Sequence, residues 1–101
     1  LNFGTADGRS CAPAILDRVV AEVGATGFSH VVNGRFKGGY ITRHYGSPAD
    51  HVHAIQLEMG QDLYMLEDPP FSYLEYKATS VQPLLQKMLL QALTALDRLA
   101  A

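Results

Sequence analysis

One connection of the chain gathers most of the residues that could bind an anion. Residues 31–46, "VVNGRFKGGYITRHYG", hold four glycines, two arginines, one lysine, one histidine and two tyrosines. Arg35 is flanked by glycines that let backbone approach a ligand closely, and a guanidinium suits bidentate recognition of a carboxylate. Lys37 and Arg43 are weaker candidates of the same kind. A solvated loop arginine explains Arg35 equally well from the pattern alone.

Glu58, in "AIQLEM", is the candidate for proton transfer. Alternation along a strand sends Gln56 and Glu58 to the face opposite Ile55 and Leu57. A carboxylate at the C-terminal end of an apolar central strand is desolvated, which would suit it to act as a general base. A glutamate that emerges at the strand end and pairs with a nearby arginine is the alternative. We expect Glu58 and Arg35 to face each other across one cleft.

A small metal site built from histidines is a weaker hypothesis. His51 and His53, at i and i+2, share a strand face, a spacing that some zinc sites use, and His44 could supply a third ligand. His53 also shares its face with apolar residues, and no carboxylate has matching spacing, so edge or hydrogen-bonded histidines fit better. Cys11 near a helix start could have a depressed thiol pKa, although a small residue filling the first turn is the favoured interpretation.

The elements that must position these residues alternate between strands and helices. We predict the end of a strand before residue 8, a helix at 9–24, strands at 27–34 and 51–59, and a helix at 80–101. Residues 40–45 could form a short exposed strand. This order predicts an α/β fold, a layered sheet with flanking helices and mainly parallel pairing. The strand at 51–59 is apolar enough to be central.

Capping residues and apolar spacing define the two helices. In the first, Ser10 can cap, Pro13 falls in the first turn and Gly24 ends the helix. In the second, Ser80 is the expected cap and Pro83 lies in the first turn. The predicted buried stripes are Ile15, Leu16, Val19, Val20 and Val23 in the first helix, and Val81, Leu85, Met88, Ala92, Leu96 and Leu99 in the last.

Composition sets outer limits on the class of protein. With 101 residues, 48% hydrophobic and 18% charged, the chain is predicted to be one globular domain over 1–101. A net charge of −2 argues against a nucleic-acid surface. A single cysteine excludes an internal disulfide and fits the reducing cytoplasm. The sequence contains no run of eighteen apolar residues, so we expect no membrane span. The missing methionine and the small sheet suggest a piece of a longer protein.

Four stretches carry a family resemblance: "FGTADGRSC", "VNGRFKGGYITRHYG", "VHAIQLEM" and "YMLED", in that order over residues 3–67. Together they resemble the C-terminal portion of the N-formylglutamate amidohydrolase (deformylase) family. The resemblance implies a zinc-dependent hydrolase with an αβα fold akin to that of the metallocarboxypeptidases and succinylglutamate desuccinylases. It also implies hydrolysis of N-formyl-L-glutamate to formate and L-glutamate, the last step of one histidine-degradation route.

The same resemblance assigns roles to particular residues. Glu58 in "QLEM" matches the general base, and Arg35 in "NGRFKGG" matches the carboxylate-binding arginine. Asn33, Tyr40 and His44 are second-rank candidates for lining the substrate site, where a dianionic substrate would account for the cationic, glycine-rich connection. The family's zinc ligands lie in motifs upstream of the matched stretches. We therefore expect this chain to hold no metal and to be inactive when isolated.

Two further expectations concern what the chain does if it is not catalytic and what covers its surface. The alternative function is a non-catalytic small anion-binding or interaction module of α/β fold. If an N-terminal half is missing, apolar surface meant for it is exposed, and we expect self-association through the sheet edge or the final helix.

Overall fold

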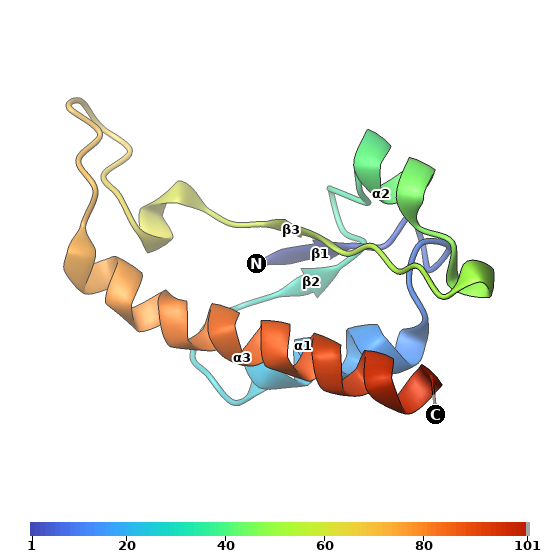
Figure 1. The fold of residues 1–101 in the computed structure, drawn as a ribbon. Helices are drawn as coiled ribbons and strands as arrows, with labels where there is room; N and C mark the ends of the chain where they lie inside the picture. Colours follow the sequence, from blue (N-terminus) through green and yellow to red (C-terminus); the bar gives the residue numbers. More distant parts are fainter. Residues whose placement is uncertain (101) are drawn as a thin grey trace.

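Three short strands form the sheet in the computed structural model, which describes residues 1–100 (Figure 1). They are β1 (Asn2–Gly4), β2 (Val31–Val32) and β3 (Gln56–Glu58), in the spatial order β2-β1-β3. The predicted α/β class is confirmed. β2 pairs with β1 in parallel, but β3 pairs with β1 antiparallel and is an edge strand of this sheet. The prediction of a central, parallel strand at 51–59 was wrong because apolar alternation is the same in strands of either direction.

Helices lie on both faces of this sheet. The long helices α1 (Pro13–Gly24) and α3 (Glu75–Ala100) cover one face, and the short helix α2 (Tyr40–Tyr45) lies on the other (Figure 1). One-turn 3-10 helices at Pro48–Asp50 and Gln61–Leu63 flank the segment that contains β3. No helix within residues 1–100 has the length and apolar content needed to cross a bilayer.

The segment at 40–45 is helical, which corrects the prediction of an exposed strand. The Arg43 N–H donates to the Gly39 carbonyl and the Gly46 N–H to the Thr42 carbonyl, both at 3.1 Å. Thr42 is buried and lies against Gly38, where an added Cβ would be 2.7 Å from the threonine Cγ2. Burial of this one side chain anchors the helix, and a six-residue pattern is too short to reveal it.

Helix α1 ends at the predicted residue, but it begins four residues after the predicted start and its cap differs. Pro13 opens the helix and Gly24 closes it. Ala12, not Ser10, occupies the N-cap position, and no side chain caps the helix. The buried Ser10 hydroxyl instead donates to the Ala54 carbonyl at 2.8 Å. Ser10 therefore joins the loop after β1 to the segment before β3.

Helix α3 begins at Glu75, five residues before the predicted cap. Ser80 lies inside the helix and its hydroxyl donates to the Tyr76 carbonyl at 3.2 Å. Pro83 also lies inside the helix rather than in its first turn. The additional turn has a packing reason, because Ala78 is buried. Contacts with the rest of the fold thus outweigh the local capping signal.

The core lies between the sheet and the two long helices. Phe3 of β1 packs with Val19 and Val23 of α1 and with Leu84 and Met88 of α3. A smaller cluster contains Cys11, Ile15 and Ala95. The α1 stripe is confirmed. The α3 stripe is confirmed at Val81 and Met88, which are buried, and at Leu85 and Ala92, which pack partly buried against the core. The other buried residues of α3 are Ala78, Leu84 and Ala95, which the predicted stripe did not include. Of the predicted α3 stripe, Leu96 and Leu99 are 38% and 41% exposed because the small sheet and α1 leave part of this helix uncovered.

Candidate functional site

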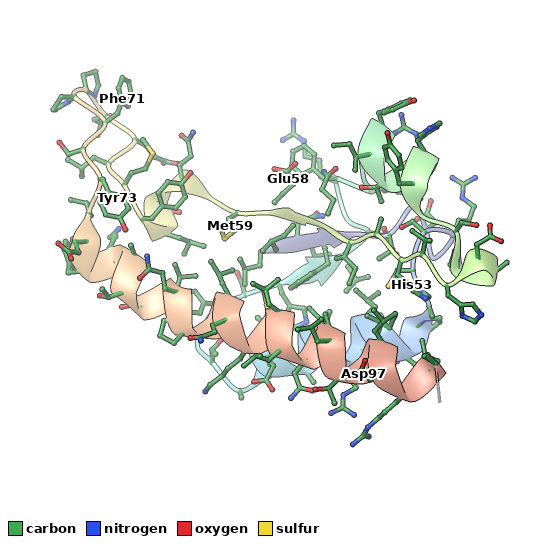
Figure 2. The ribbon with its side chains drawn as sticks, viewed as in Figure 1. His53, Glu58, Met59, Phe71, Tyr73 and Asp97 are labelled. Carbon is green, nitrogen blue, oxygen red and sulfur yellow. The ribbon has the colours of Figure 1, made fainter. Side chains whose placement is uncertain are left out.

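Glu58 ends β3 on the face of the sheet opposite the long helices. Antiparallel pairing places Glu58 across from Asn2 and Leu57 across from Phe3, so Glu58 points away from the core that Phe3 and Leu57 share. Figure 2 shows the same direction for its side chain. The carboxylate is exposed, not desolvated as predicted. Glu58 is exposed because β3 is an edge strand, which leaves the end of this strand uncovered.

Gln56 links the carboxylate to the glycine-rich loop. Its side-chain nitrogen donates to Glu58 Oε1 at 2.9 Å, and its side-chain oxygen accepts the Gly39 N–H at 2.7 Å. Both ends of this amide are therefore in use, and the carboxylate is held beside the start of α2. Strand alternation predicted Gln56 on the same face as Glu58, but the sequence pattern did not indicate a role for it. A polar residue two positions before a candidate base on a strand was the available signal.

The loop that carries Arg35 lies along this same polar face of the sheet. The Asn2 side-chain nitrogen donates to the Phe36 carbonyl at 2.6 Å, and the Ala6 N–H donates to the Lys37 carbonyl at 2.7 Å. Gly4 makes the approach possible, because a Cβ there would lie 2.7 Å from both the Lys37 carbonyl carbon and the Gly38 nitrogen. Glycine is thus required for backbone proximity and not for a positive φ.

Asn33 is used as a structural anchor. It adopts a left-handed conformation with φ of 49°. Its side-chain oxygen accepts the Thr5 N–H at 2.8 Å, and its side-chain nitrogen donates to Thr5 Oγ1 at 2.9 Å. Thr5 is fully buried. Asn33 therefore fixes the end of β2 to the loop after β1, and its amide has little capacity left for a ligand.

The cationic residues of the loop differ in their availability. Lys37 forms an ion pair with Asp7 at 3.2 Å, with both side chains more than half exposed. Arg35 is exposed, its guanidinium carbon lies 5.6 Å from the centre of the Phe36 ring, and no carboxylate in residues 1–100 pairs with it. Arg35 therefore remains free to bind an anion, unlike Lys37.

The aromatic candidates lie on α2. The Tyr40 and His44 rings stack with centroids 4.8 Å apart, and Tyr45 packs edge-on against His44 at 4.7 Å. Tyr40 is 64% exposed, and His44 is also exposed. The two predicted lining residues thus form one exposed aromatic pair, separate from the Gln56–Glu58 contact but on the helix that begins beside it.

The histidines do not assemble a metal centre. His53 Nδ1 accepts the Ala12 N–H at 3.1 Å and so supports the start of α1. His51 is exposed in a left-handed conformation with φ of 60°. Within residues 1–100, no three side chains of the types His, Cys, Asp and Glu gather at a distance suited to a metal. The hydrogen-bonded interpretation of His53 is confirmed.

Cys11 is a buried core thiol. It is 1% exposed and packs with Ile15 and Ala95. Burial raises the pKa of the Cys11 thiol above its ordinary value of 9.0, and a hydrogen bond from the Leu16 backbone opposes this shift. The thiol is therefore protonated at neutral pH, and the interpretation as a space-filling residue is confirmed.

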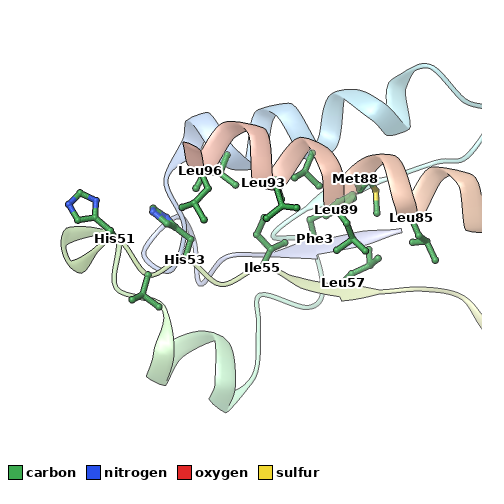
Figure 3. Close-up of a pocket in the computed structure, with 14 residues that line it drawn as sticks. Phe3, His51, His53, Ile55, Leu57, Leu85, Met88, Leu89, Leu93 and Leu96 are labelled. Carbon is green, nitrogen blue, oxygen red and sulfur yellow. The ribbon is translucent and has the colours of Figure 1, made fainter. Parts of the chain in front are cut away.

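The larger cavity lies on the core side of the sheet. It has a volume of about 930 Å³ and opens between the sheet and α3 (Figure 3). Its lining is apolar apart from His51 and His53, and includes Ile55 and Leu57 on one side and Leu89, Leu93 and Leu96 on the other. Leu89 and Leu93 are 69% and 60% exposed. We call this feature the α3 groove.

The predicted cleft shared by Glu58 and Arg35 is not found among the described cavities. Neither residue lines the α3 groove or the smaller cavity near the start of α1. Residues 1–100 thus bring Glu58, Gln56 and the loop together on an open surface, not within an enclosed site.

Comparisons with a family model, with curated proteins and with solved structures all match this chain to proteins of one kind. Residues 1–65 match the family model described as N-formylglutamate amidohydrolase. The N-formylglutamate deformylase of Pseudomonas putida is 58% identical over 97 residues, covering 93% of this chain and 35% of the relative. That of Pseudomonas aeruginosa is 51% identical over 89 residues, covering 87% and 34%. A crystal structure of N-formylglutamate amidohydrolase from Ralstonia eutropha JMP134 superposes with a TM-score of 0.75 at 28% identity, covering 96% of this chain and 33% of that one. The chain spans about a third of the length of these relatives.

Proposed function

The chain belongs to the N-formylglutamate amidohydrolase family, and from this premise we propose that it forms part of an enzyme that hydrolyses N-formyl-L-glutamate to formate and L-glutamate. The observation that carries the proposal is the family match over residues 1–65, which includes both the Arg35 loop and Glu58. The contact of Gln56 with Gly39 and Glu58 supports it, since it places the loop beside the carboxylate.

Glu58 is the proposed general base. Its carboxylate would accept a proton from the attacking water and deliver it to the amino nitrogen of glutamate as the amide C–N bond breaks. Gln56 acts as a positioning residue, because its donated hydrogen bond holds one carboxylate oxygen and leaves the other free. We further propose that Glu58 becomes desolvated only when polypeptide corresponding to the rest of the relatives' length covers the polar face of the sheet.

Arg35 is the proposed clamp for a substrate carboxylate. Its exposed guanidinium has no carboxylate partner in the described residues, and the planar fork of donors matches a carboxylate in a bidentate manner. Tyr40 and His44 offer an exposed aromatic pair that would line the same region. Asn33 would contribute indirectly, by holding the loop in place through Thr5.

The zinc implied by the resemblance does not fit the side chains of this chain. No suitable group of three ligands occurs within residues 1–100, so no step above is assigned to a metal. We propose that metal ligands come from the two thirds of the relatives' length that this chain does not span, completing a metallocarboxypeptidase-like αβα fold. A cytoplasmic location is compatible with the single buried, unpaired thiol of Cys11.

A chimera tests the proposed function. This chain would replace the matching third of the Pseudomonas putida deformylase, and formate release from N-formyl-L-glutamate would be measured. We expect activity in the chimera, and Glu58→Gln should lower kcat by about 10²- to 10⁴-fold. Asp17→Asn, which alters an exposed carboxylate on α1, is the matched control. An active chimera that tolerates Glu58→Gln would exclude Glu58 as the base.

The isolated chain provides the complementary measurement. We expect the pure 101-residue protein to bind no stoichiometric zinc and to release no formate. Turnover by the pure chain would contradict the proposal that the remaining machinery lies elsewhere. An inactive chimera together with selective glutamate binding by the chain would instead favour the non-catalytic anion-binding module.

The α3 groove is the proposed contact surface of the isolated chain. Leu89, Leu93 and Leu96 follow one another at helical spacing of four and three residues, and their exposure leaves an apolar row facing solvent. Because every copy presents the same row, we propose that a second copy covers it in an isologous dimer.

A further inference from the structure

A second, polar cavity lies where the loop after β1 meets the end of α2. It has a volume of about 150 Å³, and its lining consists of Ala6, Arg9, Ser10, Arg43 and Gly46. Two of these five residues are arginines and none is acidic. The proposed catalytic residues Glu58 and Arg35 do not line it. We call this feature the arginine cavity.

Backbone geometry positions the two arginines beside one cavity although their charges repel each other. Ala6, Asp7 and Gly8 all have positive φ, at 52°, 55° and 90°. Left-handed conformations are strained for non-glycine residues, and such strain persists where the surroundings impose it. The turn reverses the chain directly before Arg9, and the Arg9 Nε donates back to the Ala6 carbonyl at 3.0 Å. Arg9 is thereby held by its own loop.

Arg43 reaches the cavity from α2. One terminal nitrogen of its guanidinium donates to the Gly38 carbonyl at 3.0 Å, so the Arg35 loop and Arg43 are joined directly. The end of α2 lies against the loop after β1, because a Cβ added at Gly46 would clash with Ser10. The cavity is thus built from backbone contacts that would persist without a ligand.

Each guanidinium keeps unused donors. Apart from the single bond to a carbonyl, neither Arg9 nor Arg43 has a hydrogen-bond or carboxylate partner among residues 1–100. The two positive charges at this small cavity repel each other, and an anion bound between them would offset that repulsion by attracting both. The planar fork of N–H donors on a guanidinium matches the geometry of a carboxylate.

We propose that the arginine cavity binds a small carboxylate, with Arg9 and Arg43 as its two ligating side chains. Its identification with one of the two carboxylates of a glutamate-type substrate rests on the proposed function. Arg35 would then hold the other carboxylate, and the Arg43–Gly38 hydrogen bond would connect the two clamps. The site therefore selects dianionic over monoanionic amides.

Direct binding to the full 101-residue chain tests the proposal without any assay of hydrolysis. The ¹⁵N-labelled chain is titrated with L-glutamate, formate and inorganic phosphate at constant ionic strength. We expect glutamate to shift the amide signals of residues 6–10 and of Gly46. Arg9→Gln and Arg43→Gln should each weaken binding at least about tenfold, whereas Arg98→Gln near the end of α3 should leave it unchanged.

Several outcomes would overturn the proposal. Shifts confined to other regions, or equal binding by Arg43→Gln and Arg98→Gln, would remove the arginine cavity as the site. Binding of phosphate with no response to glutamate or formate would overturn the carboxylate assignment. Thermal melts of each variant check folding, and Arg43→Lys, which keeps the charge, should retain part of the affinity.

The two proposals fail separately. Glutamate binding at the arginine cavity combined with an inactive chimera would reject only the proposed function. An active chimera, together with a chain whose amide signals in residues 6–10 do not respond to glutamate, would reject only the arginine cavity.

Discussion

Replacing Gly4 by alanine should destabilise the protein because two backbones meet at this residue. The added Cβ would lie 2.7 Å from the Lys37 carbonyl carbon and from the Gly38 nitrogen, and 3.0 Å from the Lys37 oxygen. Neither segment can move freely, since the Ala6 N–H is bonded to the Lys37 carbonyl and the Gly39 N–H to the Gln56 side chain. The clash therefore strains the contact that places the loop beside Glu58.

Overpacking of this kind costs about 1–3 kcal/mol. For a domain of this size, a loss of 1 kcal/mol lowers Tm by roughly 4–8 °C, so Gly4→Ala should lower Tm by roughly 4–24 °C. Gly24 and Gly27 are matched controls, because no atom lies within 4 Å of a Cβ built at either position and neither has a positive φ. Gly24→Ala and Gly27→Ala should be neutral or slightly stabilising.

Guanidinium denaturation followed by far-UV circular dichroism measures the free energy of unfolding for the three variants. The ¹⁵N signal of Gly39 gives a local readout, since Gly4→Ala should perturb its hydrogen bond to Gln56. Equal unfolding midpoints for Gly4→Ala and Gly27→Ala, with an unchanged Gly39 signal, would refute the claimed approach of the loop to β1.

Three further predictions address the surface, the core and the start of α1. Leu93→Lys in the α3 groove should weaken self-association, measured by sedimentation, at least about tenfold. Leu90→Lys, at an exposed residue outside the groove, should have little effect. A parent chain that is monomeric at high concentration would contradict this prediction. Burial raises the pKa of the Cys11 thiol in the folded state. The stability contributed by the buried, protonated thiol is therefore fully present below about pH 9 and is lost as pH rises through the folded-state pKa. Cys11→Ala should flatten that alkaline decline in denaturation curves, and an identical decline in both proteins would argue against it. His53→Ala removes the acceptor of the Ala12 N–H and should cost about 1–2 kcal/mol in the same measurement, and an unchanged midpoint would show that solvent replaces the bond.

Local chemistry in the sequence was sufficient to predict that two long helices form, although not where either begins. Gly24 ends α1 as predicted, because the effect of a missing Cβ acts at the residue itself, whereas the helix begins at Pro13 and not at the predicted residue 9. Alternation placed Gln56 and Glu58 on one face of β3, and the antiparallel register agrees. The stretches that carry the family resemblance lie largely within the region matched by the family model.

The sequence by itself therefore determined the α/β class, the order of the three strands and the two long helices, the family and the polar face that carries Glu58. Only the tertiary structure decided that β3 is an antiparallel edge strand, that Glu58 is exposed, and that Arg9 and Arg43 share a cavity. The physical reason is that periodicity and propensity are properties of neighbouring residues. Strand direction, burial and the meeting of distant charges depend on contacts between segments that lie far apart in the chain.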